Sequence, residues 1–328
     1  MKISVAMCTY NGELYLDEQL HSIIKQSIPV DEIVICDDGS SDSTMRIIQK
    51  NIHEGAPIRV VVNRKNLGYT KNFEKAICLC SGDIIFLADQ DDIWLPDKVK
   101  TILDHFESHP NKDFVFTDGI LINHMGTECF DKTLFEVVGL NKRNLRLFDE
   151  GSIYDVLGVS GKVTGATVAF RASFIPYFLP FHDLGKLAIH DGMMAATAVI
   201  WNKISYIKRP LIKYRIHYSQ SVGLGFLFRY PTRSYEFANN VLMWHLALVE
   251  KHRPEDAYPL HMFYKRFWTI RSNFGAMILT HMFIRGEYRL YGTRRFKIYY
   301  RDMKGIAIRC MEKILYIKKI FDRDSSKV

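Results

Sequence analysis

Short apolar runs alternate with amphipathic segments through the first hundred residues, and this alternation restricts the possible fold more than any other feature. Between the first two runs, Leu16, Leu20 and Ile23 recur at the spacing of one helix face. Buried strands are expected at residues 3–7, 32–36, 58–62 and 83–88. Repeated strand–helix units of this kind predict an α/β protein with a parallel sheet and helices on both faces.

A polar cluster follows three of these strands, at residues 9–11, 37–40 and 89–92. Because ligands bind beyond the carboxyl ends of strands in an open α/β sheet, three clusters at one edge predict a binding site. Asp89 and Asp91 would repel each other without a cation, and their hard oxygens suit Mg²⁺ or Mn²⁺, which usually bridge to substrate phosphates. The alternatives are a solvated acidic turn for the third cluster and ordinary turn chemistry for the second.

Length and composition restrict the class of protein further. The 328 residues suffice for one domain of catalytic size with an appendage, and 48% apolar with 24% charged residues exclude disorder, collagen and a coiled coil. Every apolar stretch is far shorter than the ~20 residues of a membrane span, and the chain opens on a strand rather than a signal peptide. The six scattered cysteines are expected to be reduced thiols of a cytosolic protein.

The net charge of +8 is concentrated at the end of the chain. Residues 285–328 contain 13 Lys and Arg against 5 Asp and Glu, so the remainder sums to zero. Apolar residues recur at helical spacing over residues 296–321, with Lys297, Arg301 and Lys304 on the flanks or the far side. The pattern predicts either an interfacial helix on anionic lipid or a core helix with a solvated basic face. Nucleic acid ranks behind both, since no nucleic-acid-binding fold accompanies the charge.

The three polar clusters stand in a definite order together with two further motifs. The five motifs occupy residues 7–11, 34–42, 63–68, 81–83 and 86–98. This ordered set resembles the family 2 glycosyltransferases, which have the GT-A fold, a Rossmann-like nucleotide-binding mixed sheet flanked by helices. The resemblance covers about the first hundred residues and implies a nucleotide-sugar donor. Cys8 departs from the family pattern beside the base pocket, so the donor base is left open.

The resemblance also implies roles for individual residues. Tyr10 and Asp38 would contact the base and ribose of the donor. Asp91 would be the main ligand of an Mg²⁺ or Mn²⁺ cofactor, with help from Asp89. The implied donor-binding set is Thr9, Tyr10, Asn11, Asp38, Asn66, Gly68, Lys71, Asp89 and Arg215.

The likeness continues in the second half of the chain. Residues 164–171 resemble the family's acceptor-side strand, and many relatives carry the catalytic base at the place of Asp191. Displacing a diphosphate with inversion needs a carboxylate to take the acceptor's proton and a metal to stabilise the departing group. Asp191 fits the first role, and the alternative is a helix N-cap. The neighbouring His190 is expected to be orienting or structural.

Residues 213–223 contain a Tyr-Arg-x-His segment that resembles one closing the catalytic domain of bacterial polysaccharide enzymes, including rhamnosyltransferases. Arg215 can fork onto a phosphate, and His217 can bind a phosphate oxygen or the metal, unless both only pair with acidic neighbours. Relatives usually carry Asn shortly after the histidine, whereas Gln220 and Ser221 stand here, which weakens any substrate assignment. The metal site is predicted at Asp89, Asp91 and His217.

These features predict a GT-A catalytic domain at residues 1–223 and a helical, basic region at residues 224–328. The expected protein is an inverting, metal-dependent glycosyltransferase, cytoplasmic and peripheral on the inner face of the cell membrane. It would move a sugar from a dTDP- or UDP-sugar, first dTDP-rhamnose, to a lipid-linked surface glycan such as O-antigen or capsule. One alternative is a sugar nucleotidyltransferase, against which the missing Gly-rich basic loop after the first strand argues. The other is a non-catalytic membrane-docked scaffold, against which the intact aspartates argue.

Overall fold

A computed structural model describes residues 1–151, 157, 162–181, 189–217, 219 and 220 of the chain. The chain divides into two compact units, Met1–Phe226 and Leu227–Val328, and every described residue belongs to the first. The helical character expected of the basic C-terminal region, and its apolar stripe, lie outside the described residues.

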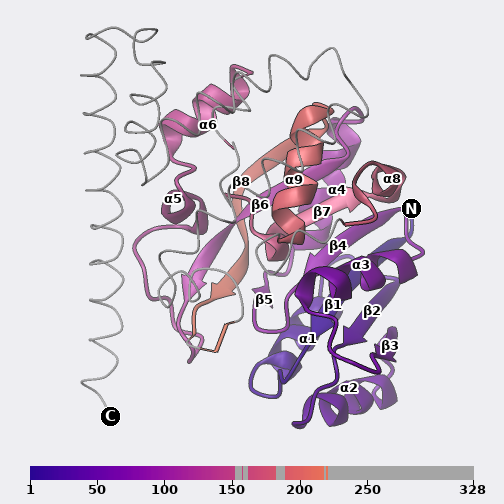
Figure 1. The fold of residues 1–328 in the computed structure, drawn as a ribbon. Coiled ribbons are helices and arrows are strands. Elements are labelled where there is room, and N and C mark those ends of the chain that lie inside the picture. Colours follow the sequence, from indigo (N-terminus) through magenta and orange to yellow (C-terminus); the bar gives the residue numbers. More distant parts are fainter. Residues whose placement is uncertain (152–156, 158–161, 182–188, 218, 221–328) are drawn as a thin grey trace, which may run out of the picture. The chain divides into compact units, whose positions relative to one another are not determined.

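One mixed sheet of eight strands forms the centre of the described unit, in the order β3-β2-β1-β4-β7-β6-β8-β5 (Figure 1). The strands are β1 (Ile3–Thr9), β2 (Glu32–Asp37), β3 (Ile58–Val62), β4 (Ile84–Ala88), β5 (Ile93–Trp94), β6 (Phe114–Ile122), β7 (Val168–Arg171) and β8 (Ile204–Arg215). The helices are α1 (Leu16–Ile24), α2 (Thr44–His53), α3 (Tyr69–Leu79), α4 (Lys98–Ser108), α5 (Leu134–Val138), α6 (Lys142–Asp149), α8 (Ile175–Phe178) and α9 (His190–Ile200), with 3₁₀ turns η1 (Gly165–Thr167) and η2 (Ala172–Phe174).

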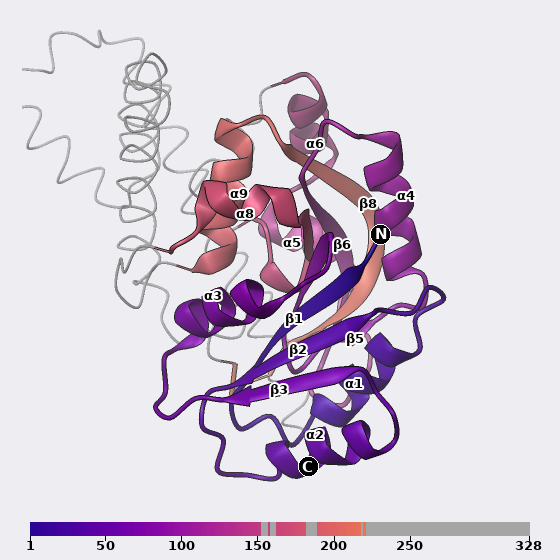
Figure 2. The same cartoon turned by 90° about the vertical axis from the view of Figure 1, so that its right-hand side faces the viewer.

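The first four strands form the parallel part of the sheet, as the repeated strand–helix units predict. β1 pairs in parallel with β2 and β4, and β2 pairs in parallel with β3. All five residues of β4 are buried, because helices cover both faces. Figure 2 shows α1, α2 and α4 on one face and α3, α8 and α9 on the other. Leu16, Leu20 and Ile23 are buried, so the spacing in the sequence identified the inward face of α1.

Strand β7 runs in the opposite direction to its neighbours and makes the sheet mixed. It runs antiparallel to both β4 and β6, and β6 then pairs in parallel with the long strand β8. The apolar residues at 163–170 are typical of one continuous strand, but only the last part of this run joins the sheet. Gly165–Thr167 instead form the turn η1, whose first residue lies against the start of α9. This turn is what brings the second half of the chain to the edge where the parallel strands end.

The carboxyl ends of the parallel strands gather the predicted polar clusters. Thr9 and Asp37 are register partners at the ends of β1 and β2, and Met7 of β1 faces Ala88, the last residue of β4. The cluster at 89–92 therefore begins beside the first two. The far end of β8 reaches the same place, because Ile93 and Trp94 of β5 pair with Lys213 and Ile212 of β8.

Two further observations concern the cysteines and the length of the helices in the described part of the chain. Cys8, Cys36, Cys78 and Cys80 are free thiols, whereas Cys310 lies outside the described residues. No helix among the described residues has both the length and the apolarity that crossing a bilayer requires.

Candidate active site

Asp37, the first aspartate of the second cluster, is a structural residue. Its buried carboxylate accepts hydrogen bonds from Thr9 Oγ1 at 2.8 Å, from Ser40 Oγ at 2.5 Å and from the backbone N–H groups of Gly39 and Ser40. The hydroxyl of Thr9, which the sequence assigned to the donor, is thereby used to join the loops after β1 and β2. A role of Thr9 in donor binding would be exerted through the shape of these loops.

The carboxylate of Asp38 holds the loop that precedes α3 by accepting several hydrogen bonds from it. Its Oδ1 accepts from Asn63 Nδ2 and from Leu67 N, both at 2.8 Å, and its Oδ2 accepts from Gly68 N at 2.9 Å. Asn66 Nδ2 donates to the backbone carbonyl of Asp38 at 3.3 Å. Three predicted donor-binding residues, Asp38, Asn66 and Gly68, are thus brought together. Gly68 has φ +77°, which a residue with a side chain would adopt only with strain.

Tyr10 is presented to solvent by a well-anchored backbone. The amide of Gln90 accepts from Tyr10 N at 2.8 Å and donates to Tyr10 O at 3.1 Å, while the Tyr10 residue is 49% exposed. Asn11 Oδ1 accepts from Ser41 N at 2.8 Å, which ties the first loop to the second. An exposed ring on a fixed backbone is suited to stacking on a flat ligand such as a nucleotide base.

The sequence analysis gave no role to Gln90, which stands between Asp89 and Asp91. The feature that could have indicated its role is Gly12, which is distant in the sequence but adjacent in the structure. A Cβ on Gly12 would lie 2.5 Å from Gln90 Oε1, so the glycine makes room for this amide. Gln90 therefore joins the loop that carries Tyr10 to the acidic turn at residues 89–92.

The acidic turn at the end of β4 concentrates negative charge. Burial, together with the nearby charges of Asp91 and Asp191, raises the pKa of Asp89 to about 8, against a lowering by Lys98. Within the described residues, the Asp89 side chain accepts no hydrogen bond. Burial and Asp91 also raise the pKa of Asp92 well above its usual value. A cation bound at this turn would relieve the mutual repulsion of these carboxylates.

Asp91 and His217, both of residue types that bind metals, lie in direct contact. His217 Nε2 lies 2.8 Å from Asp91 Oδ2, and the other ring nitrogen is 2.7 Å from Ser219 Oγ. Asp89 does not complete a three-ligand set with them, since no group of three such side chains among the described residues is arranged to hold a metal. The donor set still fits Mg²⁺ or Mn²⁺, because such ions are usually held by one or two protein ligands together with substrate phosphates.

Lys98 lies buried behind the acidic turn and was not recognised from the sequence. Its Nζ donates to the carbonyl of Ala166 in η1 at 2.7 Å and stands 4.0 Å from the centre of the Trp94 ring. Burial lowers the pKa of Lys98 to about 7, against the raising effect of Asp92 and Asp89. The lysine therefore joins the metal side of the site to the turn that supports Asp191.

Asp191 lies in the first turn of α9, held by two backbone donors. Oδ2 accepts from Gly165 N at 2.9 Å, and Oδ1 accepts from Gly192 N at 2.6 Å. Burial raises the pKa of Asp191 to about 6, although these hydrogen bonds act in the opposite direction. The N-cap alternative is wrong, because Ile189 occupies that position. A carboxylate whose pKa lies just below neutrality is suited to accept a proton.

His190 is a structural residue of the core, which is one of the two roles that the sequence predicted for it. Its ring stacks on Phe73 with 4.1 Å between centroids, and neither ring nitrogen has a hydrogen-bond partner in the described residues. Burial lowers the pKa of His190 to about 3, so the ring is neutral. A Cβ on Gly165 would lie 3.1 Å from His190 Nε2, so a larger residue there would require the ring to shift slightly.

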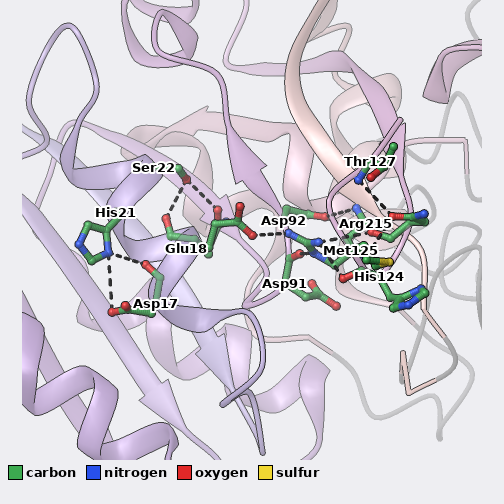
Figure 3. A network of polar contacts seen from close by, with 12 residues as sticks. Asp17, Glu18, His21, Ser22, Asp91, Asp92, His124, Met125, Thr127 and Arg215 are labelled. Atoms are coloured by element: carbon green, nitrogen blue, oxygen red, sulfur yellow. Dashed lines mark hydrogen bonds and ion pairs between the residues drawn. The ribbon is translucent and has the colours of Figure 1, made fainter. Parts of the chain in front are cut away.

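Two cationic residues of the predicted donor set are occupied by partners within the protein. Lys71 Nζ donates to Glu74 Oε2 at 2.9 Å and to the carbonyl of Phe181 at 2.6 Å. The Arg215 side chain is 2% exposed, and each nitrogen of its guanidinium donates to a protein oxygen (Figure 3). The structure thus argues against a phosphate contact by Arg215 and favours the alternative of pairing with protein groups.

The mixed sheet, with nucleotide-type loops and an acidic turn at the ends of its parallel strands, defines the class of the protein as a GT-A enzyme fold. The chain belongs to glycosyl transferase family 2, whose family model matches residues 4–176, more than half of the chain. The predictions of family and fold are confirmed.

Relatives and solved structures agree with this assignment. An uncharacterized glycosyltransferase of Nostoc sp. is 33% identical over 66% of this chain and 65% of its own length. The dTDP-rhamnosyl transferase RfbG of Shigella flexneri is 27% identical over 68% and 75%. The crystal structure of residues 1–349 of S. aureus TarS with UDP-GlcNAc shares the fold with a TM-score of 0.56 and 21% identity, over 84% of this chain and 76% of that one. The chain spans 65%, 33% and 18% of the first three curated relatives that it matches.

Proposed function

We propose that the protein transfers a sugar with inversion from a nucleoside-diphosphate donor to an acceptor hydroxyl, with help from a divalent cation. One observation carries the proposal: Asp91, which pairs with His217, and Asp191 both lie near enough to Asp89 for their charges to raise its pKa. The charges of both Asp91 and Asp191 act on Asp89, so the cation side and the base side of the site adjoin. An in-line displacement needs these two functions on either side of the anomeric carbon.

Each part of the site has a task in this reaction. The exposed ring of Tyr10 and the loop gathered by Asp38 would hold the nucleoside. Asp91 and His217 would hold Mg²⁺ or Mn²⁺, which when bound supplies positive charge to the departing diphosphate. Asp191, largely ionised at pH 7 with a pKa of about 6, would take the proton of the attacking hydroxyl.

Two relatives bear on the donor and the cation. A protein 27% identical to this chain is named a dTDP-rhamnosyl transferase, which supports dTDP-rhamnose as the first donor to try, with UDP-sugars next. The glucosyl-3-phosphoglycerate synthase of Mycobacterium tuberculosis, with a TM-score of 0.50 and 19% identity over 74% of this chain and 79% of that one, was crystallised with Mn²⁺ and UDP. The acceptor we propose is a lipid-linked surface glycan, which would place the enzyme on the inner face of the membrane.

Mass spectrometry of products tests the reaction. The full chain would be incubated with Mn²⁺ or Mg²⁺, a panel of dTDP- and UDP-sugars, and an extract of lipid-linked glycans. We expect one donor to add one sugar mass to the extract, and Asp191→Asn to abolish the addition. A chain that instead forms a nucleotide sugar from a sugar phosphate and a nucleoside triphosphate would be the nucleotidyltransferase alternative. A chain that leaves every donor unchanged would support the scaffold alternative.

A further inference from the structure

We propose that Glu18 is a positioning residue of the cation site, acting through the guanidinium of Arg215 on the turn that carries Asp91. The inference rests on the proposed function and concerns residues that do not themselves touch the cation. It assigns a task to Glu18 on α1, to which neither the sequence motifs nor the family resemblance gives a role.

Arg215 is the centre of a buried network at the end of β8 (Figure 3). Nε donates to the backbone carbonyl of Asp91 at 2.7 Å. Nη1 donates to the carbonyls of Asn123 and His124 at 3.3 and 3.2 Å, and Nη2 donates to Glu18 Oε2 at 2.6 Å. The guanidinium thus binds the acidic turn directly, and Glu18 of α1 in turn binds the guanidinium.

Glu18 supplies the one anionic partner among these acceptors of the guanidinium; the other three are backbone carbonyls. The Arg215 side chain is 2% exposed, whereas that of Glu18 is 55% exposed. Without the Glu18 carboxylate, the acceptors that hold the buried guanidinium would be three backbone carbonyls, which are weaker partners for a charge than a carboxylate. Glu18 therefore fixes the orientation in which Arg215 Nε reaches the backbone carbonyl of Asp91.

Helix α1 is built to hold this segment of chain. Gln19 Nε2 donates to the carbonyl of Asp89 at 2.9 Å, and Ser22 Oγ accepts from Trp94 N at 2.9 Å. These two contacts fix the chain on both sides of the acidic turn. Glu18, one residue before Gln19, adds the contact that reaches the middle of the turn through Arg215.

The same network also supports the second ligand. His217 follows Arg215 by two residues, and its ring lies 4.9 Å from that of Tyr15, just before α1. The guanidinium of Arg215 lies over the same Tyr15 ring at 4.6 Å. A shift of Arg215 would therefore displace Asp91 and His217 together, and residues that orient metal ligands typically change metal affinity when substituted.

Metal binding to the full chain tests the proposal, with Mn²⁺ as the probe and calorimetry as the measurement. Glu18→Gln keeps the size of the side chain and removes its charge. Asp17→Asn is the matched control, since Asp17 is the neighbour on the same helix and bonds to Asn51 and Lys50 rather than to Arg215. We expect Glu18→Gln to weaken Mn²⁺ binding about tenfold, and the control to change it less than about twofold.

Further variants separate positioning from a general loss of structure. Glu18→Asp, which keeps the charge, should recover part of the Mn²⁺ affinity, while Tm should be similar for both Glu18 variants. Equal Mn²⁺ affinity in Glu18→Gln and Asp17→Asn would overturn the positioning role alone. A wild-type chain that binds no Mn²⁺ would overturn the cation site of the proposed function, and this inference with it.

Discussion

Aspartates at one edge of the sheet are placed in different environments, and this difference assigns their roles. Asp191 accepts two backbone hydrogen bonds and contacts no cation among the described residues, whereas Asp91 lies against His217. The first arrangement leaves a carboxylate that can accept a proton, and the second a carboxylate that can share a cation. Substitution by asparagine, which keeps size and removes charge, separates the two roles.

For Asp191→Asn, we expect kcat to fall by about 10²–10⁴-fold, because a general base typically contributes that much. Donor affinity should change little, since the base acts on the acceptor hydroxyl. Steady-state kinetics and calorimetric titration with the donor nucleotide measure the two effects. A loss confined to donor affinity would remove Asp191 from the base role.

The pH dependence of the wild-type enzyme provides a separate check on Asp191. Burial raises its pKa from 3.8 to about 6, so kcat should decline as the pH falls below 6. The same shift means that the fold favours the protonated form, and the stability that this form contributes is lost as the pH rises through 6. Between pH 4 and pH 8, wild type should therefore lose more stability than the Asp191→Asn variant, whose side chain does not titrate. An equal loss of stability in both proteins over this range would show that the pKa of Asp191 is not raised.

For Asp91→Asn, we expect most activity to disappear while the fold remains intact. Loss of a charged metal ligand should remove several kcal/mol of transition-state stabilisation, at about 1.4 kcal/mol per tenfold in rate. Turnover with and without Mn²⁺, together with the melting curve, measures this. Wild-type turnover that is unchanged in a chelator would show that the reaction needs no cation.

At the scale of elements, packing explains why one motif contains its glycine. The motif at residues 81–83 enters β4 directly against β1. A Cβ on Gly82 would lie 2.5 Å from Ser4 Oγ, 2.7 Å from Ser4 N and 2.9 Å from Lys2 O. Gly82 N also donates to Ser4 Oγ at 2.7 Å. The glycine therefore permits the close approach that aligns β4, and with it the acidic turn.

Gly82→Ala should lower the free energy of unfolding by about 2–3 kcal/mol, because two of the three clashing atoms belong to the backbone and cannot turn away. Urea denaturation measures this loss. Gly55→Ala is the control: Gly55 has φ +91° but nothing within 4 Å of a Cβ. Its cost should be about 1 kcal/mol, from backbone strain alone. If both variants lost a similar free energy of unfolding, the backbone of β1 would have to move away from the added Cβ at little cost.

At the scale of the whole molecule, the basic C-terminal region provides the remaining prediction. Its residues lie outside the described part of the chain, so the expectation rests on the sequence. The net charge of +8 equals the excess of Lys and Arg after residue 284. A lipid-linked acceptor would make membrane attachment useful, since it confines enzyme and acceptor to one surface.

We expect the full chain to co-sediment with anionic vesicles and to come off partly in high salt, since each Lys or Arg near such a surface contributes about 1 kcal/mol within a Debye length of ~8 Å. Replacing Lys297, Arg301 and Lys304 with Gln should weaken sedimentation without unfolding the protein. If the substituted chain sediments like wild type, or wild type ignores the vesicles, the region is better explained as an accessory helix packed on the body.

The sequence by itself determined the parallel part of the sheet and the edge at which the candidate site lies. The periodicities of strands and helices depend only on residues close together in the sequence. The inward face of α1 and the strands up to β4 could therefore be predicted from the sequence pattern alone. The carboxyl ends of parallel strands necessarily share an edge, so the clusters after β1, β2 and β4 had to meet. The ordered motifs identified the family for the same reason.

Only the tertiary structure decided how the second half of the chain completes the site. Whether Arg215 faces a phosphate or a carboxylate depends on Glu18, which lies 197 positions away in the sequence. The burial of Lys98 behind the acidic turn likewise depends on η1, whose carbonyl it reaches at Ala166. Periodicity and spacing describe which side chains share a face of one element. They do not describe which charged groups become partners when the antiparallel insertion of β7 brings distant segments together, because burial and pairing energies arise only in that arrangement.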